Sequence, residues 1–195
     1  MSSRVVPFVN GEYYHVFNRG VAKMQIFFSF YDYTRFTKTF LYYMIDCAKP
    51  KFSIFTPTTH ELDTNKRIVE VICYCLMPNH FHFLLRQKRE GGITEFISKL
   101  SNSYTKYFNV KNRRIGPMLQ GEFKAVHIET NEQLLHLSRS SYMEYIGFIK
   151  NDTCSKEVVL DQFKSLSEYK QFVLDQEDYG KKLESIKHQL IDSED

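Results

Sequence analysis

The chain has 195 residues, of which 43% are hydrophobic and 25% are charged. These are ordinary values for a globular protein, and the length allows one well-buried domain with a small appendage. No apolar run approaches the roughly 20 residues that cross a bilayer, and residues 1–10 lack the layout expected of a secretory signal. The four cysteines form no CxxC pair, so we expect reduced thiols in a cytoplasmic protein rather than a structural zinc site.

Charge is distributed unevenly along the chain. Residues 150–195 hold 7 of the 26 basic and 11 of the 23 acidic residues, which leaves 19 basic and 12 acidic residues in 1–149. A basic body followed by an acidic tail is typical of a domain that binds a polyanion and carries a helical extension. We therefore predict a polyanion-binding domain over 1–150 and a charged helical C-terminal extension over 151–195.

Apolar periodicity and turn signals divide the chain into regular elements. The expected elements are a strand over 13–20, a helix over 31–47, strands over 67–77 and 80–87, a helix over 94–108, a strand over 118–129, and helices over 130–149 and 167–191. Pro78 and Asn79 form a tight-turn signal, which joins the third and fourth elements as a hairpin. Thr130 and Gln133 resemble a helix capping box.

The order β-α-β-β-α-β is the split βαβ arrangement of ferredoxin-like folds. We therefore predict an α+β protein with a ferredoxin-like antiparallel sheet and helices on one face, plus a C-terminal helical extension. Because one fold supports many functions, the functional prediction depends on the residues of a site.

Two histidines stand out in the predicted hairpin. His80 and His82 are two residues apart in a strand, so both imidazoles project from the same face of the sheet. Phe81 then points into the opposite layer. A pair of this kind can share one divalent cation, although ordinary surface or core histidines explain most such pairs. The position at the start of a buried strand favours a functional role, because buried polar rings need partners.

Residues 75–85 read CLMPNHFHFLL, which resembles the MPNHxHxLL signature of the REP-associated tyrosine transposases. This family belongs to the single-tyrosine HUH superfamily, in which two histidines flank a hydrophobic residue. Three other segments resemble the family in the expected order, residues 14–20 its first strand, 104–109 its second helix and 116–124 its fourth strand. The resemblance covers about residues 10–139 and implies that residues 1–150 form an HUH transposase-like domain.

The resemblance implies a protein that binds single-stranded DNA beside an imperfect hairpin. In the family a divalent cation, Mg²⁺ or Mn²⁺ by ligand type, is held by the residues that correspond to His80 and His82. The cation acts as a Lewis acid on the scissile phosphate. A tyrosine of the third helix attacks and forms a 5′-phosphotyrosine with a free 3′-hydroxyl. The implied function is a single-stranded DNA endonuclease and strand transferase in DNA transposition.

The predicted third helix departs from the family pattern LSRYIHLNP. Residues 137–139 keep Leu-Ser-Arg, but Ser140 stands at the nucleophile's position and Glu144 at the position of a third metal ligand. Tyr142 and Tyr145 lie on the same predicted helix and are the candidate nucleophiles, with Glu144 as the candidate third ligand. In the alternative interpretation about twenty residues of the family pattern are missing, and both tyrosines only pack or cover the surface.

Basic residues near these motifs are the candidate DNA contacts: Arg19, Lys106, Lys111, Arg113, Arg114 and Lys124. They alternate with Tyr104, Tyr107 and Phe108, which could stack on unpaired bases; an ordinary solvated helix face is the alternative. Glu122 is a second departure, because the family generally has arginine there. An anion near a phosphate track is expected to weaken DNA binding.

Three functions therefore compete. The first is an active transposase, and the second is a catalytically inactive relative that only binds hairpin DNA and metal. The third is a ferredoxin-like module that binds RNA or a protein and has two incidental histidines. The expected partner is single-stranded DNA with a hairpin, no membrane partner is expected, and a homodimer stays open.

Overall fold

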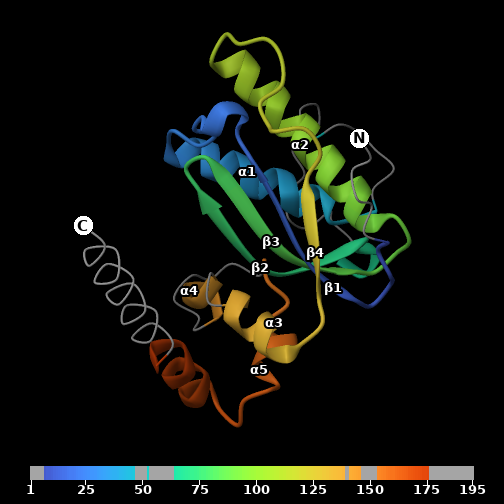
Figure 1. The fold of residues 1–195 in the computed structure, drawn as a ribbon, viewed down its shortest axis with the longest axis vertical. Coiled ribbons are helices and arrows are strands. Elements are labelled where there is room, and N and C mark those ends of the chain that lie inside the picture. The colour runs from blue at the N-terminus through green and yellow to red at the C-terminus, as the bar shows by residue number, and fades with distance from the viewer. Residues whose placement is uncertain (1–6, 47–51, 53–63, 139–140, 146–152, 176–195) are drawn as a thin grey trace, which may run out of the picture.

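The computed structural model describes residues 7–46, 52, 64–138, 141–145 and 153–175 (Figure 1). Its main elements in chain order are β1 (Tyr13–Arg19), α1 (Phe30–Tyr43), β2 (Val69–Met77), β3 (His80–Gln87), α2 (Gly92–Lys111), β4 (Lys124–Ile128), α3 (Asn131–Ser138), α4 (Tyr142–Tyr145) and α5 (Glu157–Leu160). Short 3-10 helices lie at Val21–Lys23 and Thr64–Lys66. Among the described helices, none is both long and apolar enough to cross a membrane.

The four strands form one antiparallel sheet in the order β2-β3-β1-β4. β1 and β2 are parallel to each other, with β3 between them in the opposite direction, which is the split βαβ arrangement. β2 and β3 are joined by the predicted turn at Pro78 and Asn79. The predicted ferredoxin-like α+β fold is therefore confirmed.

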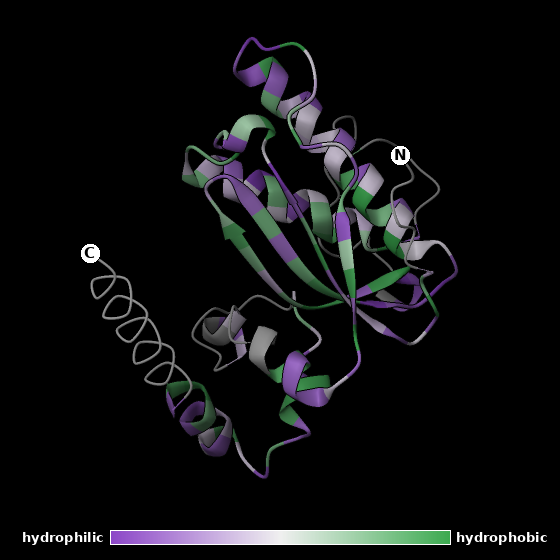
Figure 2. Cartoon of the chain, in the orientation of Figure 1, coloured by the Kyte–Doolittle hydropathy of each residue, from purple (hydrophilic) through white to green (hydrophobic). Residues whose placement is uncertain are grey.

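One face of the sheet is covered by α1 and α2, and the main core lies between these two layers (Figure 1). Side chains alternate across a strand, so Phe81, Phe83 and Leu85 of β3 all enter this core. Both helices carry an apolar stripe toward the sheet, with hydrophilic residues interspersed along them (Figure 2). Ser29 is the N-cap of α1, and its side chain forms a capping box with Asp32.

The elements after β4 lie on the opposite side of the sheet (Figure 1). They form a second apolar cluster with the sheet, in which Ile72 and Leu84 contact residues such as Tyr145, Val159 and Tyr169. The described part of the predicted C-terminal extension therefore packs on the sheet, and residues 166–175 are helical. The predicted domain boundary at residue 150 lies outside the described residues.

The segment that contains α4 covers the free edge of β2. The hydroxyl of Ser141 accepts a hydrogen bond from the amide of Tyr74 (2.9 Å) and donates one to its carbonyl (3.1 Å). The hydroxyl of Tyr145 donates to the carbonyl oxygen of Ile72 (2.8 Å). An uncovered edge strand exposes unpaired backbone groups, so these bonds fix α4 beside β2.

Candidate functional site

His80 and His82 lie at the start of β3 and face away from α1 and α2. Their neighbours in the strand, Phe81 and Phe83, are fully buried in the core, whereas both histidines are half-buried. The centroids of the two imidazole rings are 4.9 Å apart and the rings are nearly perpendicular. The period of two in a strand thus places both rings on one face, as the sequence indicates.

Each of the two imidazoles has a partner at Nδ1. The Nδ1 atom of His80 lies 2.6 Å from Oδ1 of Asn79, an oxygen that can only accept, so His80 donates from Nδ1. The Nδ1 atom of His82 lies 2.9 Å from Nε2 of His15 on β1. When Nδ1 of His82 carries the proton, both His80 and His82 keep a lone pair on Nε2. Metal-binding histidines commonly have this arrangement, with the other nitrogen hydrogen-bonded.

The surroundings keep these rings uncharged at neutral pH. Burial, followed by the neighbouring His15 and His80, lowers the pKa of His82 to about 4. Burial and the positive charge of Arg19 lower the pKa of His80, and burial lowers that of His15. A neutral imidazole is the form that binds a metal.

The two histidines open into a cavity of about 290 Å³. The other residues that line it come from β1, from the start of β4 and from the segment before β4: Phe17, Asn18, Arg19, Gln120, Glu122 and Lys124. Arg19 and Lys124 bring positive charge to the cavity, and Gln120 and Glu122 bring side-chain oxygen atoms. Neutral imidazoles beside two cations and a carboxylate can bind a phosphate group, a divalent cation or both.

Only two of the six predicted DNA contacts, Arg19 and Lys124, line this cavity. The other four are on α2 or in the segment that follows it: Lys106, Lys111, Arg113 and Arg114. Lys111 is paired with the buried Asp32, at 2.6 Å between Nζ and Oδ1. Arg114 lies over the ring of Phe108, 5.8 Å from its centroid.

Two of the three aromatic residues predicted to stack on bases are buried in the core instead. Tyr104 and Phe108 are buried, and the Tyr104 hydroxyl donates to the carbonyl of Ile26 (2.7 Å). The hydroxyl of Tyr107 donates to Oδ1 of Asp32 (2.9 Å). Tyr104 and Phe108 belong to the apolar stripe of α2 that faces the sheet. The stacking expectation is therefore wrong for these two residues.

Two of the three candidate residues of α4, Glu144 and Tyr145, are held in buried hydrogen bonds. Glu144 is 3% exposed, and its Oε1 accepts hydrogen bonds from the amides of Thr153 (2.9 Å) and Cys154 (2.8 Å). No group of three His, Cys, Asp or Glu side chains that could hold a metal exists among the described residues, so Glu144 is not brought to the histidine pair. The Tyr145 hydroxyl is bonded to Ile72, and burial raises the pKa of Tyr145 far above its usual value. The side chain of Tyr142 lies outside the described residues.

The histidine pair supplies two of the ligands that a divalent cation would need. Two neutral imidazoles, each with Nδ1 bonded, could offer Nε2, but among the described residues no third His, Cys, Asp or Glu side chain joins them in a group that could hold a metal. Mg²⁺ and Mn²⁺ usually keep several water or phosphate oxygens and need few protein ligands.

His15 was not identified as a site residue from the sequence. Its place in a strand was predictable, but its position beside His82 depends on how β1 pairs with β3.

The fold and the site together define a ferredoxin-like domain in which two histidines that face away from α1 and α2 line a cavity. No protein-family model and no curated protein matches the sequence. Among solved structures, a REP-associated tyrosine transposase bound to a REP hairpin is 13% identical with a TM-score of 0.46, over 76% of this chain and 74% of that chain. A putative transposase from Deinococcus radiodurans R1 is 12% identical with a TM-score of 0.42, over 74% and 95%.

Proposed function

We propose that this chain binds single-stranded DNA beside a hairpin and holds one backbone phosphate in the cavity of His80 and His82. The observation that carries the proposal is that both imidazoles share one cavity with Arg19 and Lys124. We include a hairpin in the proposal because residues 75–85 resemble the transposase signature.

The side chains that line the cavity would bind a phosphate in two ways, directly and through a cation. Arg19 and Lys124 can neutralise its charge and hydrogen-bond to its oxygens. His80 and His82 would hold Mg²⁺ or Mn²⁺ through Nε2, and the cation would supply Lewis-acid stabilisation of the phosphate oxygens. Asn79 and His15 orient the two rings, because each is hydrogen-bonded to an Nδ1 atom.

The proposal is one of binding rather than cleavage. None of the described residues that line the cavity is a tyrosine, and the hydroxyl of Tyr145 is bonded to the backbone of β2. Of the two candidate nucleophiles, Tyr142 is therefore the one left for attack on the phosphate. Of the three functions open from the sequence, the DNA-binding relative of the transposases has the best support.

A fluorescently labelled DNA hairpin with a single-stranded tail tests this proposal. Anisotropy titrations with Mn²⁺ would compare this DNA with the same tail without a hairpin and with RNA of equal sequence. We expect tighter binding of the hairpin DNA and no covalent adduct on a denaturing gel. Equal affinity for RNA, or no binding at all, would contradict the proposal and favour the third function.

A covalent adduct would indicate the first function, an active transposase. In that case Tyr142→Phe should abolish the adduct, whereas Tyr13→Phe should not. Tyr13 is a suitable control because it lies at the opposite end of β1 from Arg19.

A further inference from the structure

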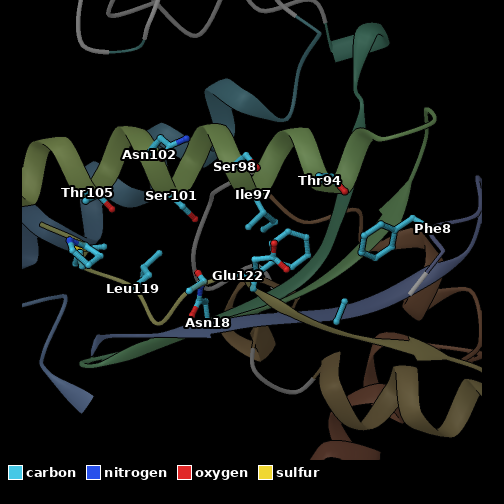
Figure 3. Close-up of a pocket in the computed structure, with 15 residues that line it drawn as sticks. Phe8, Asn18, Thr94, Ile97, Ser98, Ser101, Asn102, Thr105, Leu119 and Glu122 are labelled. Atoms are coloured by element: carbon cyan, nitrogen blue, oxygen red, sulfur yellow. The ribbon is translucent and has the colours of Figure 1, made fainter. Parts of the chain in front are cut away.

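A second and larger cavity, of about 520 Å³, lies between α2 and residues 117–125 (Figure 3). Its apolar part includes Ile97, Met118 and Phe123. Its polar part comes mainly from one face of α2, where five side chains line the cavity: Thr94, Ser98, Ser101, Asn102 and Thr105. Ligand sites in proteins commonly combine an apolar surface with a few polar groups in this way.

One polar atom of this cavity lacks a partner. The hydroxyl oxygen of Ser101 is buried and makes no hydrogen bond within the described residues. Buried polar atoms of native proteins nearly always have a partner. Rotation of the Ser101 side chain toward the cavity would give this hydroxyl a partner on a ligand.

The charges of the two cavities differ. Arg19 and Lys124 line the histidine cavity together with Glu122, whereas Glu122 is the one charged side chain among the described residues that line the larger cavity. A phosphate is therefore disfavoured in the larger cavity, and a neutral group that donates hydrogen bonds is favoured.

The two cavities adjoin each other. Asn18 and Glu122 line both of them, and Glu122 faces α2 across the larger cavity in Figure 3. A nucleotide whose phosphate lies at the histidines could thus place a neighbouring base in the larger cavity.

We infer that the cavity between α2 and residues 117–125 binds one unpaired nucleobase that carries an exocyclic amino group. The inference rests on the proposed function and names a base-binding subsite for the same DNA strand. The carboxylate of Glu122 would accept from the amino group, the Ser101 hydroxyl would bond to a second polar atom of the base, and Ile97 would contact the ring. Thymine fits poorly, because its carbonyl oxygens flank its only N–H and repel a carboxylate.

This subsite also accounts for the residue type at position 122. A carboxylate beside a phosphate weakens DNA binding, and on that basis alone Glu122 is unfavourable. A carboxylate that reads an amino group contributes base preference instead. Glu122 then determines which base binds, while Arg19 and Lys124 attract the phosphate backbone.

Binding of labelled ten-nucleotide oligo-dC and oligo-dT in Mn²⁺ tests the inference. We expect the wild-type protein to bind oligo-dC about tenfold more tightly than oligo-dT, the scale of one good base contact. Ser98 is exposed on α2 at the cavity, so Ser98→Trp should fill the cavity without disturbing the core and abolish the difference. Ser98→Ala is the matched control and should keep it. Glu122→Gln should also reduce the preference, because an amide can pair with thymine.

The outcomes separate the two proposals. If the wild-type protein binds both oligonucleotides equally, or if Ser98→Trp keeps the preference for oligo-dC, the base subsite is wrong and the proposed function stands. If neither oligonucleotide binds the wild-type protein, the subsite is wrong, and the proposed function fails with it only if hairpin DNA with a single-stranded tail does not bind either. Circular dichroism of Ser98→Trp would verify that the variant is folded.

Discussion

The Nε2 atom of His15 lies 2.9 Å from the Nδ1 atom of His82, across the pairing of β1 with β3. This contact fixes the ring of His82 and the nitrogen that it presents to the cavity. Hydrogen-bond partners of metal-binding histidines typically affect metal affinity by 10- to 100-fold. His15 is therefore a positioning residue for the histidine pair.

We predict that His15→Ala weakens Mn²⁺ binding by about tenfold. Isothermal titration calorimetry with Mn²⁺ measures the change. His127→Ala is the matched control, because His127 is on β4 and is bonded to Glu12 rather than to the pair. Equal losses in the two variants would mean that the contact between His15 and His82 has no specific role.

We predict that Arg19→Gln and Lys124→Gln each weaken DNA binding and reduce the slope of log K against log salt concentration by about one. The physical reason is that each cation in the cavity neutralises one phosphate and releases its counterion. Anisotropy titrations over a range of salt concentrations give the slope. Lys38→Gln, an exposed substitution on α1, should leave the slope unchanged.

We predict that Glu144→Ala lowers the free energy of unfolding by about 2–4 kcal/mol and leaves Mn²⁺ affinity unchanged. The carboxylate accepts two buried backbone amides, from Thr153 and Cys154, which the substitution leaves without a partner. Urea denaturation and Mn²⁺ titration together check this. The exposed Glu132→Ala serves as the control for stability. A loss of Mn²⁺ affinity in Glu144→Ala would restore Glu144 as a metal ligand.

Much of the fold was predictable because its signals are local. The predicted strands 13–20, 67–77 and 80–87 nearly coincide with β1, β2 and β3, and their period of two also places His80 and His82 on one face. The predicted strand 118–129 was too long, because only Lys124–Ile128 pairs as β4. Gly121 has a positive φ of 55°, and the residues before β4 form the walls of both cavities instead.

The parts that were missed depend on long-range contacts. Within the predicted helix 130–149 the described helical residues form α3 and α4, while residues 139–140 and 146–149 lie outside the described part of the chain. Ser141 and Tyr145 bond to the backbone at the edge of β2. Nothing near these residues in the sequence identifies that edge as their partner. The same reason explains Glu144, whose amide partners are nine and ten residues away, and His15, whose partner is on another strand.

The stability of the helix pair depends on a buried carboxylate, and this gives a prediction for pH. Burial alone would raise the pKa of Asp32, but hydrogen bonds from Lys111, Phe28, Tyr107 and Ser29 outweigh it and lower the pKa below 3.8. A carboxyl whose pKa is lowered by folding stabilises the protein above its ordinary pKa, and this contribution disappears as pH falls below that value.

We therefore predict that Asp32→Asn lowers the free energy of unfolding by about 1–3 kcal/mol at pH 7, the range for charge-assisted hydrogen bonds. The difference from the wild-type protein should shrink as the pH falls below 3.8. Urea denaturation at pH 7, 5 and 3 measures it, with the exposed Asp161→Asn as the control. A difference that is independent of pH would contradict the assignment to the ionised carboxylate.

The most direct test of the histidine cavity is the effect of Mn²⁺ on DNA affinity in the wild-type protein and in the double variant His80→Ala, His82→Ala. The proposed function predicts that Mn²⁺ tightens binding of hairpin DNA with a single-stranded tail to the wild-type protein. The double variant, if it is folded by circular dichroism, should bind the DNA more weakly and show no response to Mn²⁺. An unchanged response to Mn²⁺ in the double variant would contradict the claim that these two histidines hold the cation.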